Sequence, residues 1–378
     1  MSTIGYVCAS DPFKDRKAWS GIIFKMREAI EKAGYQVVWI PYCEDTILAK
    51  IIKWSLTLKK RMGGGNYIGG VHYEPLVKAY AKTVDETLIS QCDYLFFPGG
   101  AQLSLFFKSQ KPVIYYADAS AHLMQDYYWM NMSESALSGA KSLENRSAKH
   151  ASINIRSSKW AITSVVNDSH CSPSRCYVLE LGPNIDMKDV TPNPPYEKGT
   201  LNILFSGVDW PRKGGVIAVR TVELLVKKGL DARLIVVGPK EMPSECRGHK
   251  FIKYAGFLNK NNPTDYQRYI ALYKMSHLFL LPTTAECAGV VFSEASAFGI
   301  PSYTYDTGGT SSYVVDGING HALPTTGKPE DFANLIYKEV KSGKLKEYWQ
   351  STLQLSRERL TWEAFSHRFA EIMQNTLI

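Results

Sequence analysis

The sequence predicts an α/β protein made of two doubly wound parallel-sheet domains. Three observations carry this prediction: apolar runs that alternate with amphipathic segments, a proline-rich stretch near mid-chain, and a length of 378 residues. Short apolar strands that alternate with helices form parallel sheets covered on both faces. A chain of this length is long enough for two such domains.

In the first half, strand-like runs are followed by segments with helical spacing. The run at residues 4–10 (IGYVCAS) leads to a helical segment at 21–34 (GIIFKMREAIEKAG). Further strand-like runs lie at residues 35–42 (YQVVWIPY), 92–100 (CDYLFFPGG), 111–120 (KPVIYYADAS) and 160–167 (WAITSVVN). We expect these runs to form the first parallel sheet.

The second half repeats the alternation after a linker. Residues 183–200 contain four prolines and few apolar side chains, which is typical of a linker. Strand-like runs follow at residues 201–207 (LNILFSG), 231–239 (DARLIVVGP), 250–257 (KFIKYAGF), 277–284 (HLFLLPTT) and 300–309 (IPSYTYDTGG). We expect an N-terminal domain at residues 1–185 and a C-terminal domain at 186–361.

Composition narrows the class of protein. Hydrophobic residues make up 45% and charged residues 21%, as in ordinary globular proteins. We see no run long enough for a transmembrane helix and no secretory signal. The seven cysteines are scattered, which favours a reduced, cytoplasmic setting. The net charge of +8 suggests an anionic partner, and its dispersion argues against nucleic acid.

The segment SGVDWPRKGG, residues 206–215, is a candidate anion site. It separates an apolar run from a helical pattern and contains three glycines, Arg212 and Lys213. Ligands of doubly wound sheets bind beyond the carboxyl ends of the strands, where this segment lies. Trp210 in its middle could pack against the strand ends and hold the loop, or it could line an acceptor cleft between the domains.

Glu286 and Glu294 form a second candidate site. A helix from about residue 290 to 298 would place Glu286 in the preceding loop and Glu294 in its second turn. Gly289 lets the chain approach a ligand, and the first-turn N–H groups favour anions and hydroxyls. Sugar and ribose hydroxyls could satisfy buried carboxylates. Alternatively, one glutamate caps the helix and the other lies on the surface.

The stretch ECAGVVFSEA, residues 286–295, resembles the E-x7-E pattern of retaining glycosyltransferases of family 4, which adopt the GT-B fold. Other segments resemble that family in the same order along nearly the whole chain. They are GPNID (182–186), GVDWPRKGG (207–215), YAGFL (254–258), DGINGHALP (316–324) and LTWEAFSHRF (360–369). The resemblance implies a GT-B fold whose closing helix, about residues 362–378, crosses back onto the first domain.

The resemblance also implies roles for matching residues. Lys213 would contact the donor diphosphate, Glu294 the nucleotide ribose, and Glu286 the donor sugar. The remaining donor contacts would come from Gly207, Gly256, Phe257, Leu258, Gly289, Val290, Val291 and Gly21. For Gly21 the alternative is a glycine that only opens the first helix.

Two departures from the family pattern matter. Val208 stands where the family has an arginine. Arg212 could supply the missing charge or be an exposed loop residue, and the other candidates are basic residues of the first domain (Lys14, Arg16 and Lys17). Asp118 stands near the family's histidine, where it would act on an acceptor hydroxyl. His122 is a possible substitute, although a lone histidine is more often structural.

Two segments of the first domain bear on the acceptor. Residues 50–61, KIIKWSLTLKKR, combine Trp54 with five basic residues and could form a helix that lies on an anionic membrane. A surface helix packed on the first sheet is the alternative that we favour. Residues 125–132, QDYYWMNM, either line the acceptor site or belong to the core.

These observations predict a glycosyltransferase that moves a sugar from a UDP- or GDP-sugar to a hydroxyl of a saccharide or lipid-linked acceptor. The resemblance implies retention of configuration, with no cofactor and no metal, and a role in cell-surface polysaccharide or glycoconjugate synthesis. We expect a cytoplasmic protein, with peripheral contact with the inner face of the membrane as an option. The alternative is a non-catalytic GT-B subunit; an epimerase on the same fold is a weaker one.

Overall fold

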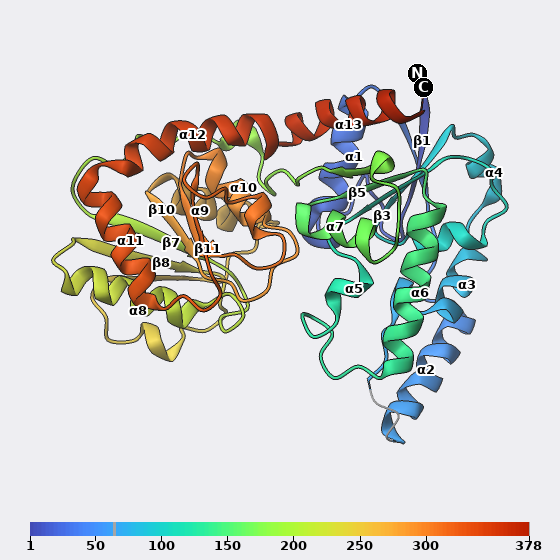
Figure 1. The fold of residues 1–378 in the computed structure, drawn as a ribbon, viewed down its shortest axis with the longest axis horizontal. Coiled ribbons are helices and arrows are strands. Elements are labelled where there is room, and N and C mark those ends of the chain that lie inside the picture. Colours follow the sequence, from blue (N-terminus) through green and yellow to red (C-terminus); the bar gives the residue numbers. More distant parts are fainter. Residues whose placement is uncertain (63–65, 378) are drawn as a thin grey trace. The chain divides into compact units, whose positions relative to one another are not determined.

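The computed structural model describes residues 1–62 and 66–377. The chain divides into two compact units, Met1–Leu179 with Phe365–Ile378 and Glu180–Ala364 (Figure 1). The first unit ends at Leu179, whereas the sequence predicts a boundary at residue 185. A second boundary falls at Phe365, three residues inside the closing helix α13 (Trp362–Leu377).

The first unit contains a six-stranded parallel sheet in the order β2-β1-β3-β4-β5-β6. Its strands are β1 Thr3–Val7, β2 Gln36–Ile40, β3 Tyr94–Pro98, β4 Val113–Ala117, β5 Ile153–Arg156 and β6 Cys176–Val178. Its helices are α1 Ile22–Lys32, α2 Ile47–Arg61, α3 Glu74–Ala81, α4 Glu86–Ser90, α5 Ala121–Met124, α6 Glu134–His150, α7 Lys159–Asn167 and most of α13. Strands β4 and β5 are buried along their whole length, as expected for strands covered by helices on both faces.

The predicted strand at residues 160–167 is wrong, because this segment is helix α7. Its β-branched residues favour a strand. However, the Ser158 side chain caps the helix by accepting a hydrogen bond from the N–H of Ala161. The buried residues Ala161, Ile162 and Val165 follow helical spacing. The strand of this region is β5, which does not stand out in the sequence because Asn154 and Arg156 interrupt its apolar residues.

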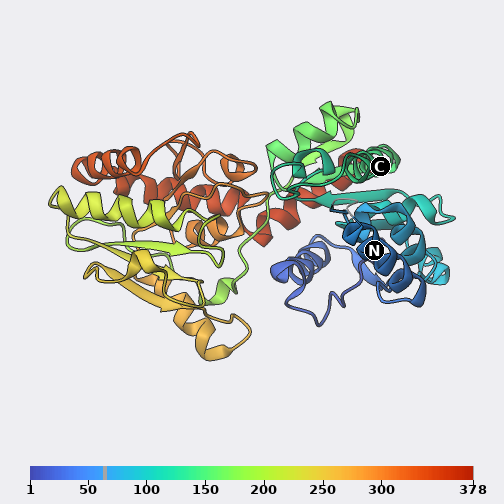
Figure 2. The ribbon, with the colours of Figure 1, turned by 90° about the horizontal axis from the view of Figure 1, so that it is seen from below.

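The second unit contains a parallel sheet in the order β12-β11-β10-β7-β8-β9. Its strands are β7 Leu201–Ser206, β8 Ala232–Val237, β9 Ile252–Gly256, β10 Leu278–Leu281, β11 Ser302–Tyr305 and β12 Gly320–Leu323. Its helices are α8 Gly215–Lys227, α9 Pro263–Lys274, α10 Val290–Ala297, α11 Pro329–Ser342 and α12 Lys344–Arg359. Figure 2 shows α8 and α9 on opposite sides of this sheet.

The five strands predicted in the second half are confirmed, and so is the helix after Gly289. The edge strand β12 was not predicted, because its sequence, GHAL, has no apolar run.

In the first unit, helix α13 packs through Phe365 and Phe369. The Phe365 ring lies 5.9 Å from that of Tyr116, and the Phe369 ring lies 5.9 Å from that of Phe96. Among the described residues, no helix is long and apolar enough to cross a membrane.

Candidate active site

The second sheet reverses its direction of winding between β7 and β10, which are neighbours in the sheet. In open parallel sheets, ligands bind beyond the carboxyl ends of the strands at such a reversal. The loop after β7 carries the predicted phosphate segment, and the loop after β10 carries Glu286. The two loops are joined by a hydrogen bond from the N–H of Thr284 to the carbonyl of Arg212, at 2.8 Å.

Gly214 sets the geometry of the phosphate loop. Its φ of 75° is left-handed, and it forms the N-cap of α8. A Cβ atom at this position would overlap the carbonyl of Pro282 in the neighbouring loop. Only glycine satisfies both demands. The N–H of Gly215 donates to the carbonyl of Trp210 at 3.0 Å, and no side chain caps the start of α8. The N-terminus of α8 therefore favours a bound anion.

Lys213 and Glu286 form an ion pair across the two loops. Each side chain is only 12% exposed, so solvent screens the pair less than it would screen a surface pair. The Lys213 stem lies over Gly207, where an added Cβ would come within 2.9 Å of the Lys213 Cγ. The structure therefore brings together the three predicted residues Lys213, Glu286 and Gly207.

Arg212 also connects the two loops. Its Nη1 donates to the carbonyl of Ala285 at 2.8 Å, and its Nε donates to the Asp209 carboxylate at 3.1 Å. The residue at the place of the family's arginine, Val208, is 60% exposed. The guanidinium of Arg212 thus holds in place the residue directly before Glu286.

We expect Arg212→Ala to weaken binding of a nucleoside diphosphate by about tenfold, the usual cost of losing hydrogen bonds to a charged group. Arg212→Lys should be nearly as harmful, because an ammonium cannot bond Ala285 and Asp209 with the same fork. Calorimetry with UDP or GDP, beside the matching nucleoside, measures both effects. A lysine variant with wild-type diphosphate affinity would show that charge alone matters, and equal losses for the nucleoside would make Arg212 a bystander.

Glu294 is wholly buried in the second turn of α10. The hydroxyls of Tyr269 and Tyr273 donate to its Oε2 at 2.7 and 3.0 Å, and Lys260 Nζ lies 2.8 Å from its Oε1. Burial, reinforced by the Glu294 carboxylate, raises the pKa of Tyr269 well above its usual value, so that its hydroxyl stays a donor. Lys260, at 30% side-chain exposure, is the donor nearest to solvent.

The two oxygens of the Glu294 carboxylate have different surroundings. The two tyrosines hold Oε2, and Oε1 is the oxygen on the side of the partly exposed Lys260. Lys260 was not predicted from the sequence, where a lysine in an asparagine-rich loop looks like an ordinary surface residue.

The start of α10 and the loop after β9 complete the predicted donor residues. Gly289 is the N-cap of α10, so the N–H groups of Val290 and Val291 lie in its first turn. Gly256 ends β9, Phe257 is exposed and Leu258 is buried in the core. The exposed Phe257 ring is therefore the member of the predicted base-binding segment that is open to stacking.

Trp210 has a packing role. Its ring lies 5.1 Å from that of Phe205, in an edge-on contact, and packs against the core of the second unit. A Cβ atom at Gly215 would clash with the indole ring. The tryptophan thus packs between the core residue Phe205 and Gly215 at the end of the phosphate loop.

The first unit contains a pocket of about 300 Å³ at the carboxyl ends of its sheet. It lies where this sheet reverses its winding, between β1 and β3. Pro98 and Gly99 come from the end of β3, and Ala117 and Asp118 come from the end of β4. The pocket therefore contains the predicted Asp118.

The loop before α1 also lines this pocket through Trp19. Trp19, Ser20 and Gly21 have successive φ values of 46°, 56° and 85°. A left-handed conformation costs a residue other than glycine about 1 kcal/mol or more. Gly21 is the N-cap of α1 and so opens this helix. The strained residues beside it place the Trp19 ring at the pocket.

His72 lines the same pocket and was not predicted. Its Nδ1 is buried and has no hydrogen-bond partner among the residues that the structure describes, and its ring centre lies 4.9 Å from that of Trp129 in a T-shaped contact. Burial lowers the pKa of His72 below its usual value, so the imidazole is neutral at neutral pH. A lone histidine in a glycine-rich sequence offers no signal of this placement.

Other predicted residues of the first domain lie elsewhere. His122 bonds through Nε2 to Asn145 Oδ1 at 2.8 Å and does not line the pocket that contains Asp118. In the segment 125–132, Trp129 packs on His72, whereas Met130 is exposed. Arg16 lies over the ring of Phe24, with its Cζ 4.4 Å from the ring centre.

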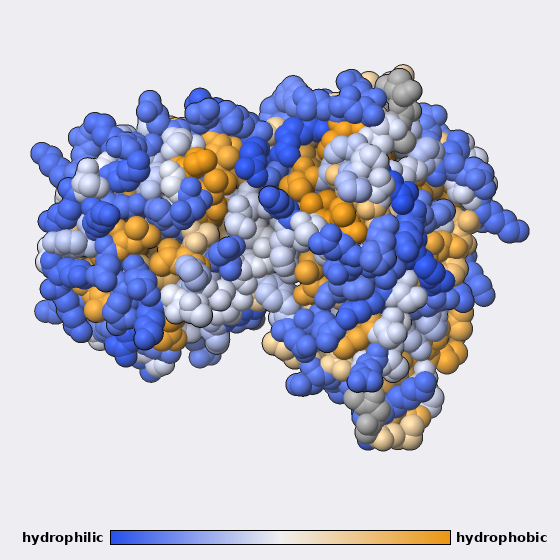
Figure 3. Space-filling view, in the orientation of Figure 1, coloured by the Kyte–Doolittle hydropathy of each residue, from blue (hydrophilic) through white to orange (hydrophobic). Residues whose placement is uncertain are grey.

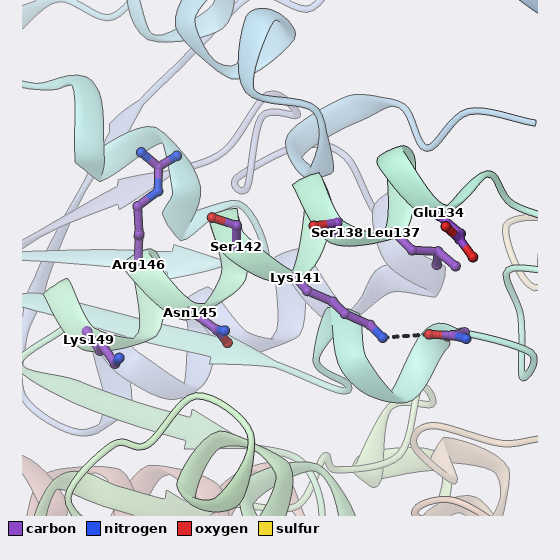
Figure 4. Close-up of a pocket in the computed structure, with 9 residues that line it drawn as sticks. Glu134, Leu137, Ser138, Lys141, Ser142, Asn145, Arg146 and Lys149 are labelled. Carbon is purple, nitrogen blue, oxygen red and sulfur yellow. Dashed lines mark hydrogen bonds between the residues drawn. The ribbon is translucent and has the colours of Figure 1, made fainter. Parts of the chain in front are cut away.

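A second hollow, of about 560 Å³, runs along α6 (Figure 4). Two of its three basic side chains are bonded within the protein: Lys141 Nζ donates to Gln125 Oε1 at 2.5 Å, and Arg146 pairs with Glu74. The hollow contains none of the predicted site residues. In the part of the chain that the structure describes, no group of three His, Cys, Asp or Glu side chains could hold a metal ion.

Comparison with known proteins identifies the fold and a family resemblance of the second unit. Residues 190–354 match the family described as Glycosyl transferases group 1. No curated protein matches the chain. The fold as a whole is that of GT-B proteins, and the residues that match the family model lie within the second unit.

Three solved structures illustrate the likeness. Sucrose-phosphate synthase from Thermosynechococcus elongatus is 14% identical with a TM-score of 0.68, covering 100% of this chain and 99% of that one. HepE from Anabaena, in complex with UDP and glucose, is 16% identical with a TM-score of 0.62, covering 99% of both chains. WaaG, a glycosyltransferase involved in lipopolysaccharide biosynthesis, is 15% identical with a TM-score of 0.56, covering 98% of this chain and 99% of that one.

Proposed function

We propose that this protein transfers a sugar from a nucleoside-diphosphate sugar to a hydroxyl of a saccharide or glycolipid, retaining the anomeric configuration and using no metal ion. One observation carries the proposal. At the reversal point of the second sheet, Lys213 and Glu286 pair beside the N-termini of α8 and α10. This combination suits a diphosphate that leaves from a sugar.

The physical chemistry of departure supports these roles. Negative charge grows on the diphosphate as the bond to the sugar breaks, and fixed positive groups stabilise it without reorganisation. Lys213 supplies a full charge, and the helix N-termini supply partial charges. The diphosphate competes with Glu286 for the Lys213 ammonium, which would leave the Glu286 carboxylate available to the donor sugar.

The donor that we propose is a UDP- or GDP-sugar. HepE, which shares the fold, has been solved with UDP, with UDP and glucose, and with UDP-glucose. Glu294 would bind the ribose, Phe257 would border the base, and backbone N–H groups of the α10 first turn would hold sugar hydroxyls. The link of WaaG with lipopolysaccharide biosynthesis supports a role in cell-surface glycoconjugate assembly, which we propose takes place in the cytoplasm.

For the acceptor we propose the pocket of the first unit. It offers an imidazole with an unused hydrogen-bonding nitrogen and the carboxylate-bearing Asp118. Aromatic faces such as Trp19 stack on the C–H faces of sugars. Asp118 would accept a hydrogen bond from the attacking hydroxyl, and His72 would bind a neighbouring one.

We expect His72→Phe to raise the KM for the acceptor by about tenfold, the usual effect of one lost hydrogen bond in a buried site. The KM for the donor should not change. His122→Phe is the matched control, because His122 does not line the pocket. Equal effects of the two substitutions, or an effect on the donor KM alone, would remove His72 from the acceptor site.

Thermal unfolding in the presence of UDP, GDP, ADP and their sugars tests the proposed donor class. A ligand that binds only the folded protein raises its stability in proportion to the logarithm of concentration. We expect stabilisation by one nucleoside diphosphate and by its sugar. Binding without any transfer would favour the second candidate, a non-catalytic GT-B subunit, for which the exposed Val208 in place of an arginine is the supporting observation.

A further inference from the structure

Helix α2 presents an unusual surface. A surface helix normally turns its apolar stripe toward the core. In α2 the residues wholly buried in the unit are Ala49 and Leu56, and the helix packs against α3. Most of its larger apolar side chains face solvent instead. Leu48, 46% exposed, lies to one side. The aligned set is 79% exposed at Ile47, 56% at Ile51, 67% at Trp54, 41% at Leu58 and 71% at Met62, which directly follows the helix.

These exposed residues form one continuous stripe. They recur at spacings of four, three, four and four positions, so they lie on one side of a helix. That side is opposite the one that carries Ala49 and Leu56, given 100° of rotation per residue. We call this set, Ile47, Ile51, Trp54, Leu58 and Met62, the α2 stripe. Single exposed apolar residues are ordinary, but an aligned set marks an interaction site.

The charges around the stripe identify its partner. Within Ile47–Arg61 there are five basic residues and no acidic one. Lys50 and Arg61 lie along one edge of the stripe, and Lys59 lies along the other, all exposed. Lys53 is turned toward the protein, with its Nζ 3.0 Å from the carbonyl of Glu44 and 4.0 Å from Asp45. The acidic Glu44 and Asp45 precede the helix.

We propose that the α2 stripe docks the protein onto an anionic lipid bilayer. The apolar side chains would enter the boundary between headgroups and acyl chains, and Lys50, Lys59 and Arg61 would contact anionic headgroups. Trp54, at the centre of the stripe, is the residue type that prefers this boundary. The helix of 15 residues is about 22 Å long and would lie flat.

The surroundings of α2 are consistent with this proposal. Figure 1 shows α2 at the periphery of the first unit, beside α3 and α6, and Figure 3 shows apolar patches among hydrophilic side chains in that region. The sequence offered two options for this segment, membrane contact or packing on the first unit. The structure shows packing on one side of the helix and an uncovered apolar stripe on the other. The proposal goes beyond sugar transfer, and it stands or falls independently of the donor.

Vesicle co-sedimentation of the full chain tests the proposal. Wild-type protein is expected to sediment with equimolar phosphatidylglycerol and phosphatidylcholine vesicles, much less with pure phosphatidylcholine, and less as salt increases. Replacing Lys50, Lys59 and Arg61 with Gln should weaken binding on the order of a hundredfold, because each basic residue contributes roughly fivefold. A matched charge control replaces the exposed Lys240, Arg247 and Lys250 of the second unit with Gln.

A second variant tests the stripe itself. Ile51→Asp with Trp54→Asp should abolish sedimentation, whereas Met242→Asp, at an exposed apolar residue of the second unit, should not. Circular dichroism and UDP or GDP binding check that the variants are folded. Unchanged sedimentation of the stripe variant would overturn the proposal. So would a stripe variant that changes only the oligomeric mass in solution, because that result would assign the stripe to a second copy of the chain.

Discussion

Replacing Lys213 with alanine is expected to lower kcat/KM for sugar transfer on the order of a hundredfold or more, the usual cost of losing one group that stabilises developing charge. The ammonium is held between the phosphate loop and Glu286 with little exposure, so neighbouring side chains cannot easily replace it. The substitution also leaves Glu286 without its cation next to the leaving group. Initial-rate kinetics on the purified protein measure the loss.

Lys227→Ala provides the control for Lys213→Ala. Lys227 is an exposed lysine at the opposite end of α8, so its removal changes the net charge equally but leaves the loops intact. We expect this variant to keep wild-type turnover. A Lys213→Ala enzyme with near wild-type turnover would mean that the diphosphate is neutralised elsewhere.

Glu294→Ala is expected to lower both nucleotide affinity and stability. The carboxylate is fully buried and receives hydrogen bonds from Tyr269, Tyr273 and Lys260. Removing one member of a buried ionic network leaves the others unsatisfied, at a cost of about 3 kcal/mol. Ribose contacts are made in the ground and transition states alike, so the loss should appear in binding. Calorimetry with UDP or GDP and thermal unfolding measure the two effects.

Glu286→Ala is the matched comparison for Glu294→Ala. Glu286 lies in the loop and pairs with Lys213, outside the buried tyrosine network. We expect it to slow transfer while nucleotide affinity and stability change less. Equal losses of nucleotide affinity in the two variants would contradict the separate roles of sugar contact and ribose contact.

Much of the second unit could be predicted from its sequence, because its strands are apolar runs and its loops contain unusual residue types. Lys213 and Glu286 were named from the sequence pattern and the family resemblance, and the structure places them in contact. The predicted strand at residues 160–167 failed because β-branched residues also suit a buried helix when a serine caps its start. Local sequence could not distinguish these options, since burial on α7 depends on the surrounding unit.

The residues that sequence reasoning missed depend on distant contacts. His72 is brought to Asp118 by the packing of its short 3₁₀ segment, Gly70–His72, beside the ends of β3 and β4. Lys260 meets Glu294 across 34 positions of sequence. Neither residue lies in a motif, and no spacing rule connects it with its neighbour. The structural role of Arg212 was missed for the same reason. Its guanidinium bonds the carbonyl of Ala285, which lies outside the segment 206–215.

Nuclear magnetic resonance of the glycoside formed from a UDP- or GDP-sugar and its acceptor tests the central claim most directly. The coupling of its anomeric proton distinguishes the two configurations, which do not interconvert in a glycoside. The account predicts that the transferred sugar keeps the configuration that it had in the donor, and that Lys213→Ala abolishes its formation. A product with the inverted configuration would contradict the proposed retaining transfer, and so would a donor that binds tightly but never loses its sugar to any saccharide or glycolipid acceptor.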